Sequence, residues 1–281
     1  MEAETKPAID RASAEYWQDV WRGAPLPRPV EPHDKSLRNH VRRAIDGFLA
    51  WALAGRSWTP LRLIEVGCGH SVWLPYFACE HGFAVAGLDY SEVGCLSARG
   101  LLSRGGIEGE IRRGDLWAPP EDWLGAFDIV FTNGLVEHFQ PTASVLTALA
   151  QLLRPGGLMI TLVPNMAGWP GDATRLLNRP VFDIHVPLDA AQLADAHRAA
   201  SLEVQHCDYL CYMNFGVVNL KDAPGGGAVR LAKYLAWGAM VALSAATWWL
   251  EDHRLISPRP NRRTSPYIAC LARKFANGGE R

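Results

Sequence analysis

The chain has 281 residues, 48% of them hydrophobic, which is enough for one large domain with a sizeable core. Its 28 lysines and arginines balance 29 aspartates and glutamates, so no excess of positive charge indicates DNA or bulk RNA as a partner. The six cysteines lack the spacing of a zinc site or a small disulfide framework, and Met1–Asp10 lacks the features of an export signal. We therefore expect reduced thiols and a cytoplasmic location.

Residues 1–55 are predicted to form an N-terminal helical cap. Tyr16, Trp17 and Trp21 mark a first helical segment, which ends before a proline-rich stretch. The spacing of apolar residues predicts a second helix over Ser36–Ala54. The aromatic side chains of the first segment either close over a ligand as a lid or fasten that segment to the core.

The most informative segment is a glycine turn that follows an apolar strand. The strand carries the acidic residue Glu65 near its end and opens into a Gly-x-Gly turn at Gly67 and Gly69. A strand, a glycine turn and a helix bring backbone N–H groups close to a ligand, which is typical of nucleotide-type cofactor sites. A dinucleotide is disfavoured because Trp73 occupies the place of the third glycine in its fingerprint. A carboxylate at Glu65 suits a ligand that carries a cation or hydroxyl groups.

Two later strands are also followed by acidic residues. Phe83–Leu88 alternates as a strand and precedes Asp89, and Gly109–Arg113 precedes Asp115. In a doubly wound sheet, an acid after the second strand meets ribose hydroxyls. Helices are predicted between the strands, over residues 73–81, 92–104 and 142–153. This alternation indicates an α/β fold.

A fourth strand, Phe127–Gly134, contains Asn133 and leads into a Glu-His-Phe sequence that includes His138. After the next helix, an Arg-Pro-Gly-Gly turn at residues 154–157 precedes a fifth strand, Leu158–Val163. The order strand, helix, strand is thus maintained from the first glycine turn onward.

In order and spacing, these segments resemble the motifs of the class I S-adenosylmethionine-dependent methyltransferases, of the small-molecule type. The resemblance covers Leu61–Asn165 and implies S-adenosylmethionine as cofactor. It also implies a doubly wound, Rossmann-like, seven-stranded sheet whose last strand is antiparallel. We expect the last two strands over Ser201–Cys211 and Ser265–Lys274, and one methyltransferase domain over residues 56–281 with an insert at about 212–262.

Nine residues are expected to contact this cofactor: Glu65, Gly67, Gly69, Asp89, Tyr90, Asp115, Leu116, Asn133 and Trp17. In the family, the acid at Asp115 accepts a hydrogen bond from the adenine amine, and the strand end at Asn133 faces the methionine part. Each polar residue also has a plainer interpretation. Glu65 and Asp89 would cap the following helices, and Asn133 would shape the turn.

His138 and His185 are the candidate catalytic bases. His138 follows the fourth strand, and His185 lies in the connector after the fifth strand, where relatives place residues that face the acceptor. A neutral imidazole accepts a hydroxyl proton near neutral pH. The alternatives are a packing or capping role for His138 and a solvent-facing loop position for His185. A bound metal ion is not expected, because Asn133 and Glu137 provide too few oxygen ligands at this strand end.

The insert contains an apolar segment, Ala228–Leu250, in which 17 consecutive residues from Tyr234 to Leu250 carry no charge. Such a run is shorter than the roughly 20 residues of a membrane span. Two interpretations remain open. It forms a buried helix that covers the active site or pairs with a second subunit in a homodimer, or it lies on a bilayer surface, peripheral to the membrane.

The acceptor is expected to be a small, apolar or aromatic molecule that is methylated at oxygen. The chain lacks the Pro-Pro-aromatic motif of base-amine methyltransferases and the cysteine nucleophile of pyrimidine carbon-5 enzymes. Its 11 tryptophans favour an apolar pocket. One alternative is a membrane lipid, prenyl or glycolipid acceptor reached through residues 228–250. Another is a scaffold subunit that binds the cofactor without turnover.

Overall fold

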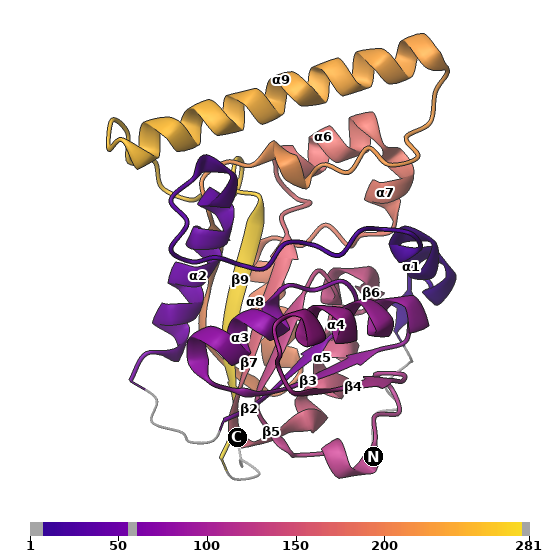
Figure 1. Ribbon diagram of the computed structural model, residues 1–281, viewed down its shortest axis with the longest axis vertical. Helices are drawn as coiled ribbons and strands as arrows, with labels where there is room; N and C mark the ends of the chain where they lie inside the picture. The colour runs from indigo at the N-terminus through magenta and orange to yellow at the C-terminus, as the bar shows by residue number, and fades with distance from the viewer. Residues whose placement is uncertain (1–7, 56–60, 277–281) are drawn as a thin grey trace.

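The computed structural model describes residues 8–55 and 61–276 (Figure 1). Within these ranges, a seven-stranded sheet has the order β4-β3-β2-β5-β7-β9-β8. Its strands are β2 (Arg62–Val66), β3 (Ala84–Asp89), β4 (Gly109–Arg113), β5 (Phe127–Asn133), β7 (Leu153–Pro164), β8 (Leu202–Leu210) and β9 (Tyr267–Lys274). β2, β3, β4, β5 and β7 pair in parallel, whereas β9 is antiparallel to both β7 and β8. The predicted doubly wound sheet with an antiparallel last strand is confirmed.

Helices cover both faces of the sheet. They are α2 (His40–Leu53), α3 (Trp73–His81), α4 (Glu92–Arg104), α5 (Thr142–Leu152) and α8 (Ala190–Ala199). Ile129 and Phe131 of β5 belong to the core formed with α2, α3 and α4, and Val130 belongs to the core formed with α5 and α8. Successive residues of β5 thus face opposite helical layers, which explains why this central parallel strand is buried along almost its whole length.

Most predicted elements are present with nearly the predicted bounds. α3, α4 and β4 begin and end at the predicted residues. The helix predicted over Ser36–Ala54 consists of the 3-10 turn η1 (Leu37–Asn39) and α2. β7 begins at Leu153, earlier than predicted, because the Arg-Pro-Gly-Gly segment belongs to the strand. Its pairing with β5 is irregular there, and Gly156 has a φ of 77°.

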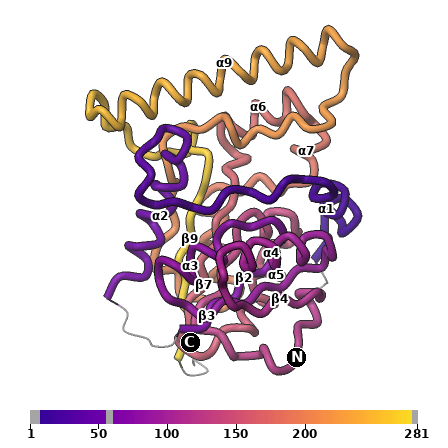
Figure 2. Tube along the Cα trace, viewed as in Figure 1, coloured from indigo at the N-terminus to yellow at the C-terminus, as the bar shows by residue number. Residues whose placement is uncertain are grey.

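The N-terminal segment joins the carboxyl edge of the sheet through a pair of short strands that the sequence did not predict. β1 (Ile9–Asp10) pairs antiparallel with β6 (Phe139–Gln140), and α1 (Ala14–Trp21) follows. Figure 2 shows the chain running from α1 across the same end of the sheet to α2. The pairing brings α1 close to the ends of the central strands.

The connector after β7 and the insert form a smaller layer beyond this edge. The connector holds α6 (Trp169–Leu177) and α7 (Arg179–Asp183), and the insert holds the 3-10 turn η4 (Phe215–Val217) and α9 (Gly227–Asp252). α9 lies across the top of the molecule in Figure 1. It packs on η4 and α6 through a small apolar cluster that includes Trp237 and Met240. The indole N–H of Trp237 donates to the Phe215 carbonyl oxygen at 3.2 Å.

α9 is largely exposed in the single chain and lines neither cavity, so the interpretation as a buried helix that covers the active site is wrong, whereas pairing with a second subunit stays a prediction. Within α9, only Ser244 and Thr247 are buried, whereas Leu231 and Leu235 are 61% and 66% exposed. No helix in the described part of the chain combines the length and apolar character that crossing a bilayer demands. The proposed boundary between residues 55 and 56 adjoins residues 56–60, outside the described ranges, and stays a prediction.

Candidate active site

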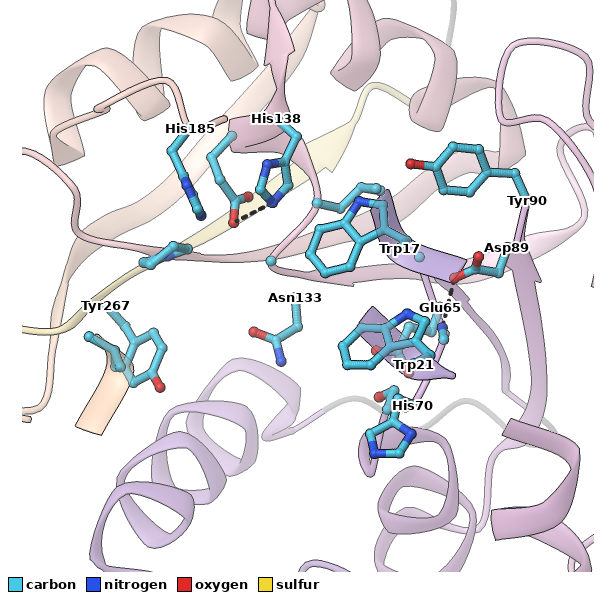
Figure 3. Close-up of a pocket in the computed structure, with 18 residues that line it drawn as sticks. Trp17, Trp21, Glu65, His70, Asp89, Tyr90, Asn133, His138, His185 and Tyr267 are labelled. Carbon is cyan, nitrogen blue, oxygen red and sulfur yellow. Dashed lines mark hydrogen bonds and ion pairs between the residues drawn. The ribbon is translucent and has the colours of Figure 1, made fainter. Parts of the chain in front are cut away.

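Two adjoining cavities lie at the carboxyl ends of the central strands, and Figure 3 shows the residues that line the larger one. Their volumes are about 450 Å³ and about 310 Å³. Gly67, Asp89, Tyr90 and Leu135 line both. These four residues therefore form a wall that the two cavities have in common.

The structure brings all eleven predicted site residues to these cavities. Those that line the larger cavity alone are Trp17, Glu65, Gly69, Asn133, His138 and His185. Asp115 and Leu116 line the smaller cavity alone, and Gly67, Asp89 and Tyr90 line both. Residues separated by up to 168 positions, from Trp17 to His185, therefore surround one space.

The glycine turn requires glycine at both positions. Gly67 has a φ of 76°, a left-handed conformation that side chains disfavour, and its N–H donates to the Leu88 carbonyl oxygen at 2.8 Å. At Gly69, a Cβ would lie 2.8 Å from Asp89 Oδ2 and 3.1 Å from Trp21 Nε1. The Gly69 N–H instead donates to Asp89 Oδ2 at 2.7 Å. The turn thus connects the ends of β2 and β3 closely.

Glu65 is a buried carboxyl group with an unused oxygen. The residue is 1% exposed, and its Oε2 has no hydrogen-bond partner among the described residues. Burial raises the pKa of Glu65 to about 8, opposed by a hydrogen bond with Ser71. An unpaired polar atom is costly inside a protein, so this oxygen favours a cationic or hydrogen-bonding ligand. The ammonium group of S-adenosylmethionine fits that requirement.

Asp89 stands between the two cavities. Its Oδ1 accepts from the Ser91 N–H at 2.7 Å, and its Oδ2 accepts from Gly69. Burial raises its pKa, and the two backbone hydrogen bonds oppose that rise. A carboxylate offers about four lone-pair sites, so two remain for the hydroxyl groups of a ribose.

The smaller cavity has the shape of an apolar slot with a polar end. Leu116, Leu135 and Phe139 line it together with Asp115, whose Oδ1 accepts from the Trp117 N–H at 3.0 Å. A flat, apolar ring with a hydrogen-bond donor at its edge suits this surface. The slot therefore matches an adenine base.

Aromatic rings from α1 form one wall of the larger cavity. Trp17 stacks on Trp21 with centroids 5.4 Å apart, and Trp21 stacks on His70 at 5.0 Å. Trp17 also meets the His138 ring edge-on at 5.2 Å. α1 has no fully buried residue. Trp21 and His70 were not among the predicted cofactor contacts, since their stacking depends on how α1 crosses the sheet.

The other end of the larger cavity holds a cluster of Glu137, His138 and His185. Glu137 and His138 belong to the 3-10 turn η3 (Val136–His138) directly after β5, and His185 follows α7. Glu137 Oε1 lies 3.8 Å from His138 Nε2, and the two imidazole centroids are 4.5 Å apart. The Val186 N–H donates to the Glu137 carbonyl oxygen at 2.7 Å, which holds the two loops together.

Backbone carbonyl oxygens fix the tautomers of both histidines. His138 Nδ1 lies 2.9 Å from the Ile184 oxygen, and His185 Nδ1 lies 2.6 Å from the Val181 oxygen. A carbonyl oxygen only accepts, so each Nδ1 carries the proton and each Nε2 presents a lone pair. Burial lowers the pKa of His138 to about 4 and that of His185 to about 3, so both rings are neutral at physiological pH.

Glu137 is the residue of this cluster that the site prediction omitted. It is 1% exposed, neither of its carboxyl oxygens has a hydrogen-bond partner among the described residues, and burial raises its pKa to about 8. The Glu-His-Phe sequence after the fourth strand was the available signal. Tyr267 and Val217, also in the cavity wall, come from distant segments without a motif. The expectation that no metal ion binds was based on oxygen ligands alone. The imidazole of His185 was not considered as a ligand.

Comparisons with known proteins show the family to which the chain belongs. Residues 37–210 match the family model described as a methyltransferase domain. The chain is 34% identical over 156 residues to the ubiquinone biosynthesis O-methyltransferase of Caulobacter sp. (strain K31), a match that covers 54% of this chain and 59% of that enzyme. The chain thus spans about three fifths of the length of this curated relative.

A longer match includes most of both chains. The probable S-adenosylmethionine-dependent methyltransferase of Mycolicibacterium smegmatis (strain ATCC 700084 / mc(2)155) is 30% identical over 222 residues, which cover 78% of this chain and 76% of that protein. Among solved structures, the [4+2]-cyclase SpnF has the same fold, with a TM-score of 0.58 at 17% identity and coverage of 96% and 98%. The chain belongs to the class I S-adenosylmethionine-dependent methyltransferases, and S-adenosylmethionine is its cofactor.

Proposed function

We propose that the enzyme transfers the methyl group of S-adenosylmethionine to a hydroxyl oxygen of a small, apolar or aromatic acceptor. The observation that carries this proposal is the position of two neutral imidazoles, His138 and His185, in the same cavity as the unpaired oxygen of Glu65. The name of the Caulobacter relative, an O-methyltransferase of ubiquinone biosynthesis, supports oxygen as the attacked atom.

The cofactor-binding residues divide between the two cavities. In this proposal Glu65 and Asn133 hold the amino-acid part, Asp89 holds the ribose, and Asp115 and Leu116 hold the adenine. Bound S-adenosylmethionine supplies an activated methyl group. The chain contributes alignment, because holding the acceptor oxygen in line with the carbon–sulfur bond lowers the barrier by several kcal/mol.

The histidines act on the acceptor. Each Nε2 offers a lone pair on the buried side of the cavity, so a hydroxyl group placed there is activated by the imidazoles while the methyl group leaves sulfur. The indole of Trp17 covers His138 and limits the access of water. These roles for Trp17, His138 and His185 are part of the proposal.

Labelled S-adenosylmethionine and a panel of phenols, catechols, hydroxyquinones and aliphatic alcohols test the proposal. We expect label transfer to at least one hydroxyl compound. His138→Ala and His185→Ala should each lower turnover by about 10²-fold or more, while calorimetry shows unchanged affinity for S-adenosylmethionine. The matched control is His33→Ala, which removes an exposed histidine outside the site.

Three results would contradict the proposal in whole or in part. Transfer only to nitrogen or carbon acceptors would exclude oxygen as the attacked atom. Tight cofactor binding with no transfer to any acceptor would favour the scaffold role. Unchanged turnover in either histidine variant would remove that residue from the reaction.

A second candidate concerns the source of the acceptor, because the exposed face of α9 suits an enzyme that takes its acceptor from an anionic lipid surface. Basic residues stand at both ends of the helix, Arg230 and Lys233 near its start and Arg254 just after its end. The acid Asp252 is directed instead to Arg43 of α2, at 2.9 Å. An apolar face between basic ends favours anionic headgroups. Binding to anionic vesicles tests this candidate.

A further inference from the structure

We propose that Glu137, His138 and His185 form a binding site for a divalent transition-metal ion that receives the acceptor. One ligand atom from each side chain lies within 4.8 Å of the other two. No other set of three such side chains gathers in this way within residues 8–55 and 61–276. The effect of the ion on the acceptor rests on the proposed function. The metal site does not depend on that function.

The Nδ1 hydrogen bonds of His138 and His185 are of the kind that metal-ligating histidines make. A ligating imidazole commonly donates its other N–H to a carbonyl or carboxylate oxygen, which fixes the ring and its tautomer. His138 and His185 both have this contact, to the carbonyl oxygens of Ile184 and Val181. Their free Nε2 atoms belong to the same cluster as Glu137 and line the same cavity. Figure 3 shows the His138 and His185 side chains next to each other at this end of the cavity.

Glu137 supplies the independent observation. It is 1% exposed, and both of its carboxyl oxygens lack a hydrogen-bond partner among the described residues. The unprotonated Nε2 of His138 lies 3.8 Å from Glu137 Oε1 and offers no hydrogen. Burying a carboxyl group whose two oxygens lack hydrogen-bond partners is costly, and a cation bound between the three side chains would remove that cost.

The ligand set determines the class of ion. Two imidazoles and one carboxylate are the ligands of zinc, iron and related divalent ions, whereas Mg²⁺ and Ca²⁺ prefer oxygen ligands. Ligand atoms about 2 Å from one ion lie about 3–3.5 Å apart, so binding would draw the three side chains together by about 1 Å. The pair of loops is linked by the Val186 to Glu137 hydrogen bond, which keeps such a movement local.

An ion held by three ligands retains open positions that face the cavity. Those positions favour an acceptor with two adjacent oxygens, such as a catechol or a hydroxyquinone, over a single hydroxyl group. The ion lowers the pKa of the bound hydroxyl, whose proton passes to solvent. The acceptor oxygen then forms a bond with the methyl carbon as the carbon–sulfur bond breaks, and S-adenosylhomocysteine leaves. With an ion bound, the Nε2 lone pairs coordinate it, so the histidines activate the acceptor through the ion and not by direct contact.

The test uses tag-free, full-length protein that has been treated with a chelator and then titrated with Co²⁺. We expect visible ligand-field absorption that saturates at one Co²⁺ per chain and that Zn²⁺ removes by competition. Glu137→Gln and His185→Asn should each weaken Co²⁺ binding by about tenfold or more. His33→Ala, which removes an exposed histidine, should bind Co²⁺ like the unmodified protein.

Two measurements separate loss of the site from loss of the fold. Each variant should bind S-adenosylmethionine with unchanged affinity and melt within a few degrees of the unmodified protein. If a variant fails to fold, Co²⁺ absorption of the unmodified chain, compared with and without a catechol, still tests the site, since a coordinating acceptor changes the spectrum. Absence of a saturable one-to-one Co²⁺ spectrum, or binding that persists in both variants, overturns the proposal.

Activity distinguishes this inference from the proposed function. Co²⁺ binding that depends on Glu137 and His185, without methyl transfer to any hydroxyl acceptor, supports the metal site and contradicts the proposed function. Full turnover in the chelated protein, with turnover lost in His138→Ala, overturns the role of the ion and supports direct activation by the imidazole.

Discussion

Two buried carboxyl groups, Glu65 and Glu137, share one cavity, and each has at least one oxygen without a protein partner. Burial raises the pKa of both to about 8. Retaining such groups destabilises a fold unless a ligand compensates them. Their positions at the two ends of the cavity divide it into a cofactor end at Glu65 and an acceptor end at Glu137.

At Glu65, we predict that Glu65→Gln weakens S-adenosylmethionine binding by about tenfold or more, because hydrogen bonds to charged groups contribute about 1.5–3 kcal/mol. Calorimetry measures the dissociation constant. The matched ligand is 5′-methylthioadenosine, which lacks the amino-acid part and should bind the variant and the unmodified protein equally. An equal loss of affinity for both ligands would mean that Glu65 supports the adenosine part or the fold.

Single residues were predictable where a motif fixes the backbone. Gly67, Gly69 and Asp89 follow from the strand, turn and helix pattern, because a positive φ and a close contact between strands demand them. Glu137 was not predictable as part of a cluster. Its relation to His185 depends on a connector that returns over the end of β5, and no local periodicity encodes that path.

At the scale of elements, α8 is attached to the sheet by a buried histidine. His197 is fully buried, with its Nδ1 2.8 Å from the Leu193 oxygen and its Nε2 3.0 Å from Thr161 Oγ1 of β7. Burial lowers the pKa of His197 to about 4. Protonation of His197 would place a positive charge in the buried contact between α8 and β7 and would therefore lower the stability of the fold.

The sign of the pH dependence follows from this pKa. The unfolded chain binds the proton below about pH 6.5, and the folded chain does so only below about pH 4, so stability falls as the pH decreases between these values. His197 should therefore account for a loss of about 2 kcal/mol between about pH 7 and about pH 5. Urea unfolding of the unmodified protein and His197→Gln at both pH values measures it. Equal losses in the two proteins would show that His197 does not titrate in this way.

Elements with a strong pattern were predicted almost completely. The helices at α3 and α4 have clear starts and stops, such as the αL residue Gly82 after α3 and the Ser91 cap of α4. β1 and β6 were not predicted, because two-residue strands contain no periodicity. Their pairing is stabilised by tertiary contacts, including the Arg11 N–H that donates to the His138 carbonyl oxygen at 2.9 Å.

At the scale of the whole molecule, the family resemblance predicted the doubly wound sheet with its antiparallel last strand, but the position of α9 was not predictable. The uncharged segment predicted an apolar helix, and either burial or exposure satisfied the pattern. The structure uses small residues and hydroxyls, Ser244 and Thr247, on the inner face and leaves the leucines outside. Exposed apolar faces of this kind mark contact surfaces.

For this face, we predict that the enzyme sediments with phosphatidylglycerol vesicles at low salt and much less with phosphatidylcholine vesicles. The double variant Leu231→Glu with Leu235→Glu should bind at least about tenfold more weakly, because burying one leucine contributes about 1.5–3 kcal/mol. Leu96→Glu is the matched control, since Leu96 is 59% exposed on α4, outside this layer.

Analytical ultracentrifugation without lipid gives the competing result. A dimer that dissociates in the double variant, together with no vesicle binding by the unmodified protein, would assign this face to a second copy of the chain. A monomer that fails to bind either kind of vesicle would contradict both interpretations.

The way α1 is attached has a consequence for exchange of ligands. The helix buries no side chain fully and is held by the two residue pairs between β1 and β6, by packing on α4 and by the Lys221 side chain. Separating it from the core therefore costs much less free energy than disturbing the sheet. The wall made by Trp17 and Trp21 is thus the part of the cavity that opens most easily, so spent cofactor can depart while β2, β3 and β5 keep their register.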